Sequence, residues 1–143
     1  MPTDEPVAGE DAGGATTGGA NDEESAYANR IRELAADARR ARETFVPPED
    51  GEGAERATEC ARDGVGPVVA VYVEARTAAR PVRFSAAEHR LLRRALNDWL
   101  GLYARCHGVE LDADFSVRAA AELLVETRDA RDTAELLTRV PER

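Results

Sequence analysis

The amino-acid sequence predicts a mainly α-helical fold, a small bundle of four to six helices that forms one domain over residues 21–143 behind a disordered acidic tail. Three observations support this prediction. Apolar side chains recur at helical spacing in several segments. The longest segment has a capping pattern at its start and a glycine at its end, and the prolines lie between segments or at their first positions. With 143 residues, the chain is long enough to bury a single core.

Residues 85–108 are expected to form the central helix. Ser85 and Glu88 fit the S-x-x-E capping box, and Gly108 is the residue type that most easily takes the left-handed conformation after a helix. Phe84, just before the cap, is placed to pack as part of a hydrophobic staple. The apolar side chains between the two ends fill one arc of roughly 140° around the helix axis. They are Leu91, Leu92, Ala95, Leu96, Trp99, Leu102, Tyr103 and Cys106.

The N-terminal part divides into a tail and a helix. Residues 1–20 contain almost no branched aliphatic or aromatic side chain, so they are predicted to be a disordered acidic tail. Asn21 should cap a helix that runs to about Phe45 and ends before Pro47. Its apolar side chains form a heptad seam that would pack on the central helix or, alternatively, on a second copy or another protein. The seam consists of Tyr27, Ile31, Leu34, Ala38, Ala41 and Phe45.

The middle of the chain leaves one alternative open. Residues 47–53 (PPEDGEG) have the composition of a flexible linker, and residues 54–63 resemble a short helix that ends near Gly64. Over residues 68–84, alternating valines fit a short β-hairpin, which would make the fold α+β. Helical spacing fits about as well, with Pro67 as a first helical residue, and the helix is the preferred interpretation.

The C-terminal part predicts two further helices. After a polar loop, residues 116–127 place apolar side chains on one helical face. Asp132 is then expected to cap a last short helix, which Pro141 ends.

Composition and charge indicate the cellular environment in which the protein works. The chain has 28 acidic and 19 basic residues, all of the latter arginine, for a net charge of −9. Such an acidic surface fits either a partner surface that repels polyanions or adaptation to a salt-rich cytoplasm; the absence of Lys and the low aromatic content favour the second. The sequence shows no secretory signal and no apolar run of the ~20 residues that span a bilayer. We therefore expect a cytoplasmic protein without membrane contact.

The sequence offers no metal or cofactor site. His89 and His107 lie at the same angle on the central helix but roughly 27 Å apart along its axis, so one ion cannot bind both. Cys60 and Cys106 lack the closely spaced ligand pairs of structural zinc sites, and they are expected to be reduced thiols. A site formed by both cysteines and His107 would require the short helix to pack alongside.

No catalytic constellation is present either, and we expect no enzyme. The acidic loop with Glu110, Asp112 and Asp114 lacks the spacing and the glycine of an EF-hand, so it is interpreted as a solvated loop. No glycine-rich phosphate loop or G-x-S-x-G elbow occurs in the chain.

Two arginine clusters could contact phosphate, although a Lys-free protein also uses arginine on ordinary exposed faces. Arg94 and Asp98 have the spacing of an ion pair along one helix. The net charge of −9 makes nucleic acid an unexpected partner. The clusters are Arg39, Arg40 and Arg42 in the first helix, and Arg90, Arg93 and Arg94 in the central one.

Residues 116–124 (SVRAAAELL) resemble the opening helix of helix-turn-helix domains of the excisionase and MerR type. The resemblance implies a DNA-binding or regulatory module over residues 116–139. The sequence departs from that pattern because it has no glycine at the turn, has a longer connection and carries Glu135 in the last helix.

From Ser25 to Arg143 the chain is similar to small uncharacterised proteins of haloarchaea. The similarity includes YVEART, VRFSAAE, ALNDWLGLYARCHG and LLTRVPER. It implies a cytoplasm at high salt and brings no known activity. The expected function is a non-enzymatic helical protein-interaction domain of a halophile. The alternatives are a nucleic-acid-binding or regulatory module over residues 116–139 and a small metal-dependent protein.

Overall fold

Helices form the whole framework of residues 23–141, the part of the chain that the computed structural model describes. Within these residues there are five helices when α2, η1 and α3 are taken as one, and no strand, which confirms the mainly α prediction. The predicted tail over residues 1–20 lies outside the described residues. The elements are α1 (Ala28–Glu43), α2 (Gly53–Cys60), the π-helical turn η1 (Ala61–Val65), α3 (Gly66–Thr77), α4 (Ala86–Cys106), α5 (Val117–Thr127) and α6 (Ala130–Thr138).

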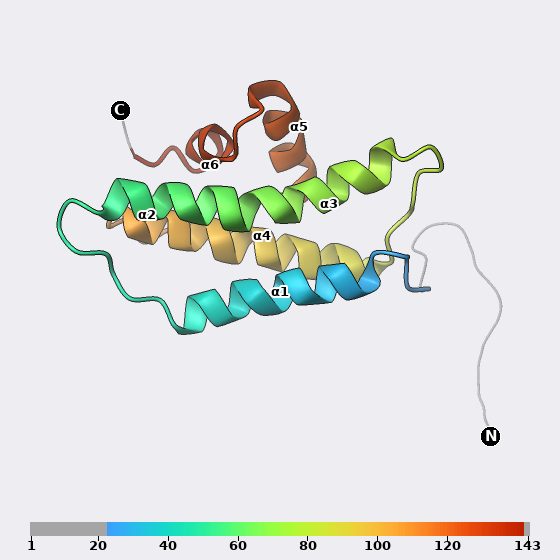
Figure 1. The fold of residues 1–143 in the computed structure, drawn as a ribbon, viewed down its shortest axis with the longest axis horizontal. Coiled ribbons are helices and arrows are strands. Elements are labelled where there is room, and N and C mark those ends of the chain that lie inside the picture. The colour runs from blue at the N-terminus through green and yellow to red at the C-terminus, as the bar shows by residue number, and fades with distance from the viewer. Residues whose placement is uncertain (1–22, 142–143) are drawn as a thin grey trace, which may run out of the picture.

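The helices form a bundle around α4. Figure 1 shows α1, α4 and the α2–α3 helix running alongside one another, with α5 and α6 folded across one side. The side chains of α4 that face this core include Leu92, Leu96, Leu100 and Tyr103, all fully or almost fully buried. Leu100 lies outside the predicted arc. The buried arc of α4 is wider than predicted because α1, α2 and α6 contact it from different directions.

Both predicted ends of the central helix are confirmed. The Ser85 N–H donates to Oε1 of Glu88 at 2.8 Å, and the Glu88 N–H donates to Oγ of Ser85 at 3.1 Å, so the capping box is complete. At the other end, Gly108 takes φ = +78°, in the left-handed region.

The predicted helix end near Gly64 is wrong. The chain passes through η1 without a break, so α2 and α3 continue into one another as a single helix. A Cβ atom added at Gly64 would collide with the indole ring of Trp99 on α4. Glycine is therefore present because the Trp99 ring lies directly against the backbone of the π-helical turn.

The α+β alternative over residues 68–84 is also wrong, since residues 66–77 are helical and Pro67 lies in the first turn of α3. Val68, Val69 and Val71 are all fully buried. Because α5, α1 and α4 all contact α3, this helix is apolar on most of its circumference and shows no one-sided pattern.

The first helix begins at Ala28 rather than after Asn21, which lies outside the described residues. Its heptad seam packs on α4 of the same chain, where Ile31 and Ala38 are completely buried. The seam therefore packs inside the chain, as the first of the two alternatives expected, and its use by a second copy or a partner stays a prediction.

Two other boundaries differ from the prediction. The last helix is capped by Asp129 instead of Asp132, whose N–H donates to Oδ1 of Asp129 at 2.9 Å. The connection from α5 is shorter than predicted because Arg128 takes the left-handed conformation. The predicted linker over residues 47–53 ends in a helical residue, Gly53, which begins α2 and lies so close to the Cys106 carbonyl that a Cβ would collide with it.

Candidate binding pocket

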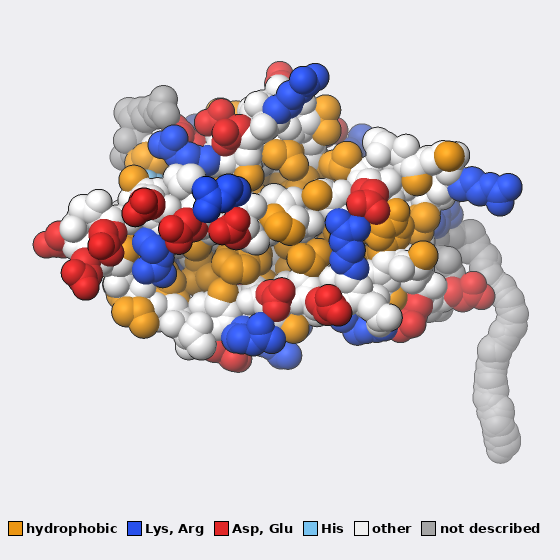
Figure 2. Space-filling view, in the orientation of Figure 1, with side chains coloured by type: hydrophobic (Ala, Val, Ile, Leu, Met, Phe, Trp, Pro, Cys, Tyr) orange, Lys and Arg blue, Asp and Glu red, His pale blue; other side chains and the backbone are white. Residues whose placement is uncertain are grey.

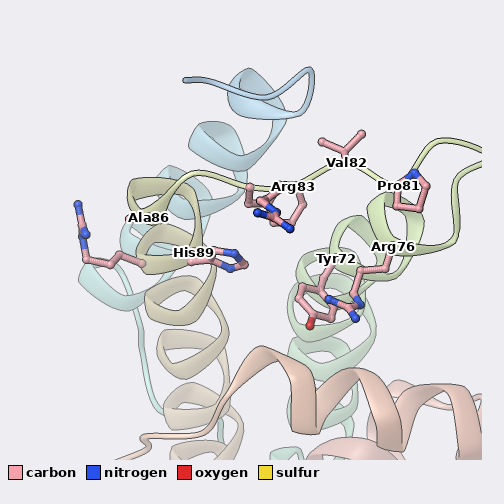
Figure 3. Close-up of a pocket in the computed structure, with 9 residues that line it drawn as sticks. Tyr72, Arg76, Pro81, Val82, Arg83, Ala86 and His89 are labelled. Atoms are coloured by element: carbon pink, nitrogen blue, oxygen red, sulfur yellow. The ribbon is translucent and has the colours of Figure 1, made fainter. Parts of the chain in front are cut away.

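A hollow of about 800 Å³ lies between the C-terminal half of α3, the connection that follows it and the first turns of α4. We refer to it as the Arg pocket. Figure 3 shows the His89 ring pointing from α4 toward α3, where Arg76 and Tyr72 lie together. The residues that line the Arg pocket are Tyr72, Arg76, Pro81, Val82, Arg83, Phe84, Ala86, His89 and Arg90.

Phe84 organises the apolar wall of the Arg pocket. It is 4% exposed, and its ring centroid lies 6.0 Å from that of Tyr27, 6.5 Å from Tyr72 and 5.6 Å from His89. The contact with His89 is the hydrophobic staple that the sequence suggested. The connection is fixed to α3 because the Val82 N–H donates to the Ala75 carbonyl at 3.0 Å. The Arg pocket therefore has an aromatic wall that is fixed to both α3 and α4.

Arginine supplies the charge of the Arg pocket. The Arg76 guanidinium lies over the Tyr72 ring, 5.5 Å from its centroid, in a cation–π contact. Arg83 is exposed, and Arg90 lies at the α4 edge, where it also borders a neighbouring hollow. Within residues 23–141 none of these three arginines has a carboxylate partner, and no residue lining the pocket is acidic.

Eight arginines in the described part of the chain form ion pairs, whereas those of the Arg pocket, like Arg39 and Arg94 elsewhere, do not. Arg30 contacts Glu74 at 3.0 Å, and Arg93 contacts Asp114 at 2.6 Å. Figure 2 shows acidic and basic side chains interspersed over one face of the molecule, with hydrophobic side chains visible between them. In a chain of net charge −9, an acid-free hollow with three arginines is a local reversal of the overall charge.

The buried carboxylate of Glu88 lies just behind this wall. It is 4% exposed, and its Oε2 accepts hydrogen bonds from the Ser25 N–H at 2.8 Å and from the Ser25 hydroxyl at 3.0 Å. Burial raises the pKa of Glu88, but the hydrogen bonds from Ser85 and Ser25 outweigh it and the net shift is downward. The charged Glu88 thus occupies the N-terminus of α4, where an external anion would otherwise bind.

A second hollow, of about 390 Å³, adjoins the Arg pocket between α3 and α5. Tyr72 and Arg76 line both hollows. The second one also contains Arg118, which contacts Glu122 at 3.5 Å, and Val125, which is 61% exposed. The two hollows together form an elongated surface whose side chains are apolar and basic except for Glu122, and this length suits an extended ligand.

The two histidines considered for a metal site lie far apart. His89 and His107 lie at opposite ends of α4, and His107 packs on the Tyr103 ring at 5.3 Å. Burial and then Arg131 lower the pKa of His107, against the opposing effect of Glu135. Among the described residues there is no cluster of three side chains that could hold a metal ion.

The two cysteines do meet, which the sequence alone left open. The thiols of Cys60 on α2 and Cys106 on α4 lie close enough to influence each other's pKa. Burial, with the neighbouring Cys106, raises the pKa of the Cys60 thiol to about 12, and burial also raises the pKa of Cys106.

The acidic loop pairs with two arginines of α4, one of which, Arg93, belongs to an arginine cluster. Glu110 lies 4.0 Å from Arg105, and Asp114 contacts Arg93. The predicted pair between Arg94 and Asp98 is replaced by one across the bundle, because Arg42 of α1 contacts Asp98 at 3.3 Å. The loop is therefore bound to the surface of α4 by ion pairs.

The C-terminal helix pair carries exposed side chains of both charges, Arg118, Arg128, Arg131 and Arg139 among them. At the start of α6, the part of a recognition helix that would approach base edges, the exposed acids Asp129 and Asp132 flank Arg131. Thr133 and Ala134 are completely buried, while Leu136 is 55% exposed. This distribution of charge disfavours contact with a polyanion.

Fold and pocket together define a small helical-bundle domain with an open, arginine-lined hollow. Residues 25–142 match the family described as Domain of unknown function (DUF8055). Because the match covers most of the chain, the protein belongs to this family. No curated protein and no solved structure matches the chain. None of the helices in residues 23–141 is both long and apolar enough to span a bilayer.

Proposed function

We propose that this domain is a non-enzymatic interaction module that binds an acidic protein segment through the Arg pocket. One observation carries the proposal. Arg76, Arg83 and Arg90 surround a hollow that has an aromatic wall, contains no acidic side chain and leaves these guanidiniums without carboxylate partners in the described part of the chain. Such guanidiniums can each take a carboxylate in a bidentate pair.

The shape of the surface favours a peptide over a compact anion. The three arginines come from α3, the connection and α4, and the adjoining hollow at Val125 extends the surface. Glu88 already fills the backbone anion site at the start of α4, so binding has to use side chains. Val82, Pro81 and Tyr72 provide contact area for aliphatic groups between the acids.

We further propose a haloarchaeal cytoplasm as the setting, on the basis of the acidic, Lys-free composition. At 1 M salt the Debye length is about 3 Å, so charges that do not touch are screened from each other. Binding there would depend on carboxylates in direct contact with guanidiniums and on apolar contact with the aromatic wall. The Arg pocket provides both the guanidiniums and the aromatic side chains for such contacts.

The proposal is tested with a fluorescein-labelled peptide of twelve residues that combines glutamate with leucine and alanine. The titrated protein is the full chain with Asp4, Glu5, Glu10, Asp11 and Asp22 changed to Asn or Gln, so that its own N-terminal acids do not compete. We call this variant the tail-neutral chain. Saturable binding by fluorescence anisotropy is expected.

Two further sets of substitutions in the tail-neutral chain locate the binding site. Arg76→Gln, Arg83→Gln and Arg90→Gln should weaken binding at least tenfold. Arg39→Gln, Arg40→Gln and Arg62→Gln remove the same charge from exposed positions outside the Arg pocket and should change affinity less than twofold. Equal losses in both sets, or no saturable binding by the tail-neutral chain, would show that the Arg pocket is not an acidic-peptide site.

A further inference from the structure

The first 22 residues of the chain have the chemistry that the Arg pocket would bind. They contain five carboxylates, from Asp4, Glu5, Glu10, Asp11 and Asp22, and neither Lys nor Arg. Four of these carboxylates form two adjacent pairs, and Pro6 and Val7 lie between the pairs. A segment with paired acids around a small apolar stretch complements guanidiniums around an aromatic wall.

This segment joins the folded domain close to the Arg pocket. Ser25 is bound to Glu88, which precedes the pocket residue His89 in the first turns of α4. Tyr27 contacts Phe84, which lines the pocket. Figure 1 shows α1 beginning at the same end of the bundle as the connection between α3 and α4. Residues 1–22 are therefore attached beside the hollow and not at the far end of the bundle.

The chain is long enough to reach. About twelve residues separate Asp11 from Glu23, and at roughly 3.4 Å per extended residue they span up to about 40 Å. A random-coil chain of that length has a root-mean-square end-to-end distance of about 20 Å. Attachment at this distance gives an effective concentration on the order of millimolar, so even weak carboxylate–guanidinium contacts are populated within one molecule.

We propose that residues 4–11 occupy the Arg pocket of the same chain and that an acidic partner segment has to displace them. This inference rests on the proposed function, because it assigns a second, internal ligand to the same surface. The N-terminal segment then sets the apparent affinity for partners, since only the open fraction of molecules binds. Modification or removal of these acids would switch the domain to its tighter-binding form.

The test compares the wild-type chain with the tail-neutral chain in the same anisotropy titration. The tail-neutral chain should bind the acidic peptide at least fivefold more tightly. A matched control removes five acids from the opposite end of the bundle, by Glu49→Gln, Asp50→Asn, Glu52→Gln, Glu55→Gln and Glu59→Gln. This control changes the net charge equally, and its affinity should stay within twofold of wild type.

A second measurement observes the internal contact without any peptide. In NMR spectra of the free proteins, the Nε–Hε signals of Arg76, Arg83 and Arg90 should differ between the wild-type and tail-neutral chains and be unchanged in the matched control. Equal peptide affinity of the wild-type and tail-neutral chains would overturn the internal contact and leave the proposed function standing. If the tail-neutral chain binds no peptide, the proposed function is wrong. If the arginine signals are the same in the wild-type and tail-neutral chains, the internal contact is wrong.

Discussion

Glu88 and Ser25 are 63 positions apart in sequence, yet the Glu88 carboxylate accepts both the backbone N–H and the hydroxyl of Ser25, at 2.8 and 3.0 Å. The same carboxylate closes the capping box with Ser85. One buried charge thus joins the entry to α1 with the start of α4, directly behind the aromatic wall of the Arg pocket.

Replacement of Glu88 by Gln should destabilise the fold by about 1–3 kcal/mol, because buried donors lose a charged acceptor and the new amide adds donors of its own. Urea unfolding followed by circular dichroism measures the free energy of unfolding. Glu126→Gln, at an exposed position of α5, is the control and should stay within about 0.5 kcal/mol of wild type. A Glu88→Gln protein as stable as the control would exclude this role for the carboxylate.

The contribution of Glu88 should depend on pH. Its pKa is lowered in the folded state, since hydrogen bonds from Ser85 and Ser25 outweigh burial. A carboxyl with a lowered folded-state pKa stabilises the fold above its unfolded pKa of about 4.3, and this stabilisation is lost as pH falls through the folded-state value. The stability difference between wild type and Glu88→Gln should therefore be largest near neutral pH and shrink below about pH 4. A difference that grows toward acid would contradict the assigned shift.

Gly64 and Gly101 provide a pair of substitutions with opposite expected signs. Gly64→Ala should destabilise the protein by about 1–3 kcal/mol, because the new methyl group would overlap the Trp99 ring. Gly101, inside α4, has no atom closer than the Leu111 carbonyl oxygen at 4.0 Å from an added Cβ. Gly101→Ala should therefore stabilise by about 0.5–1 kcal/mol. Chemical denaturation of both variants is the measurement, and similar effects in both would refute the close contact at Trp99.

The thiols of Cys60 and Cys106 should be unreactive in the folded protein. Burial raises the pKa of both thiols, that of Cys60 to about 12, so very little thiolate is present at pH 8. Alkylation by iodoacetamide should be at least tenfold slower in buffer than in concentrated urea. Mass spectrometry of the alkylated peptides gives the rate at each cysteine. Equal rates in both solvents would mean that these thiols are accessible thiolates.

Features set by neighbouring residues were predictable from the sequence. The capping box of Ser85 and Glu88 and the left-handed Gly108 depend on residues within a few positions, and both are present. The role of Gly64 could not be predicted from its neighbours in sequence. In sequence it resembles a helix end, whereas its actual role depends on Trp99, 35 positions further along.

The Arg pocket was missed for a related reason. Arg76 and Arg83 both lie in residues 68–84, where the sequence leaves a helix and a hairpin open and so does not place either side chain. They come together because Val82 bonds back to Ala75 and turns the connection onto α3. The alternation of arginine with Val82 and Phe84 was the only local signal, and it is common in solvent-exposed connections. The bond between Ser25 and Glu88 likewise depends on the packing of two distant helices.

The central claim is that the Arg pocket binds an acidic segment, and the most direct test is a titration of the acidic peptide into the tail-neutral chain, followed by NMR. The account predicts saturable shifts of the arginine Nε–Hε signals of Arg76, Arg83 and Arg90, together with the backbone amides of Val82 and His89. Signals of Arg39, Arg40 and Arg62 should stay in place. Shifts that are absent at the pocket, or that gather on α5 and α6 instead, would contradict it.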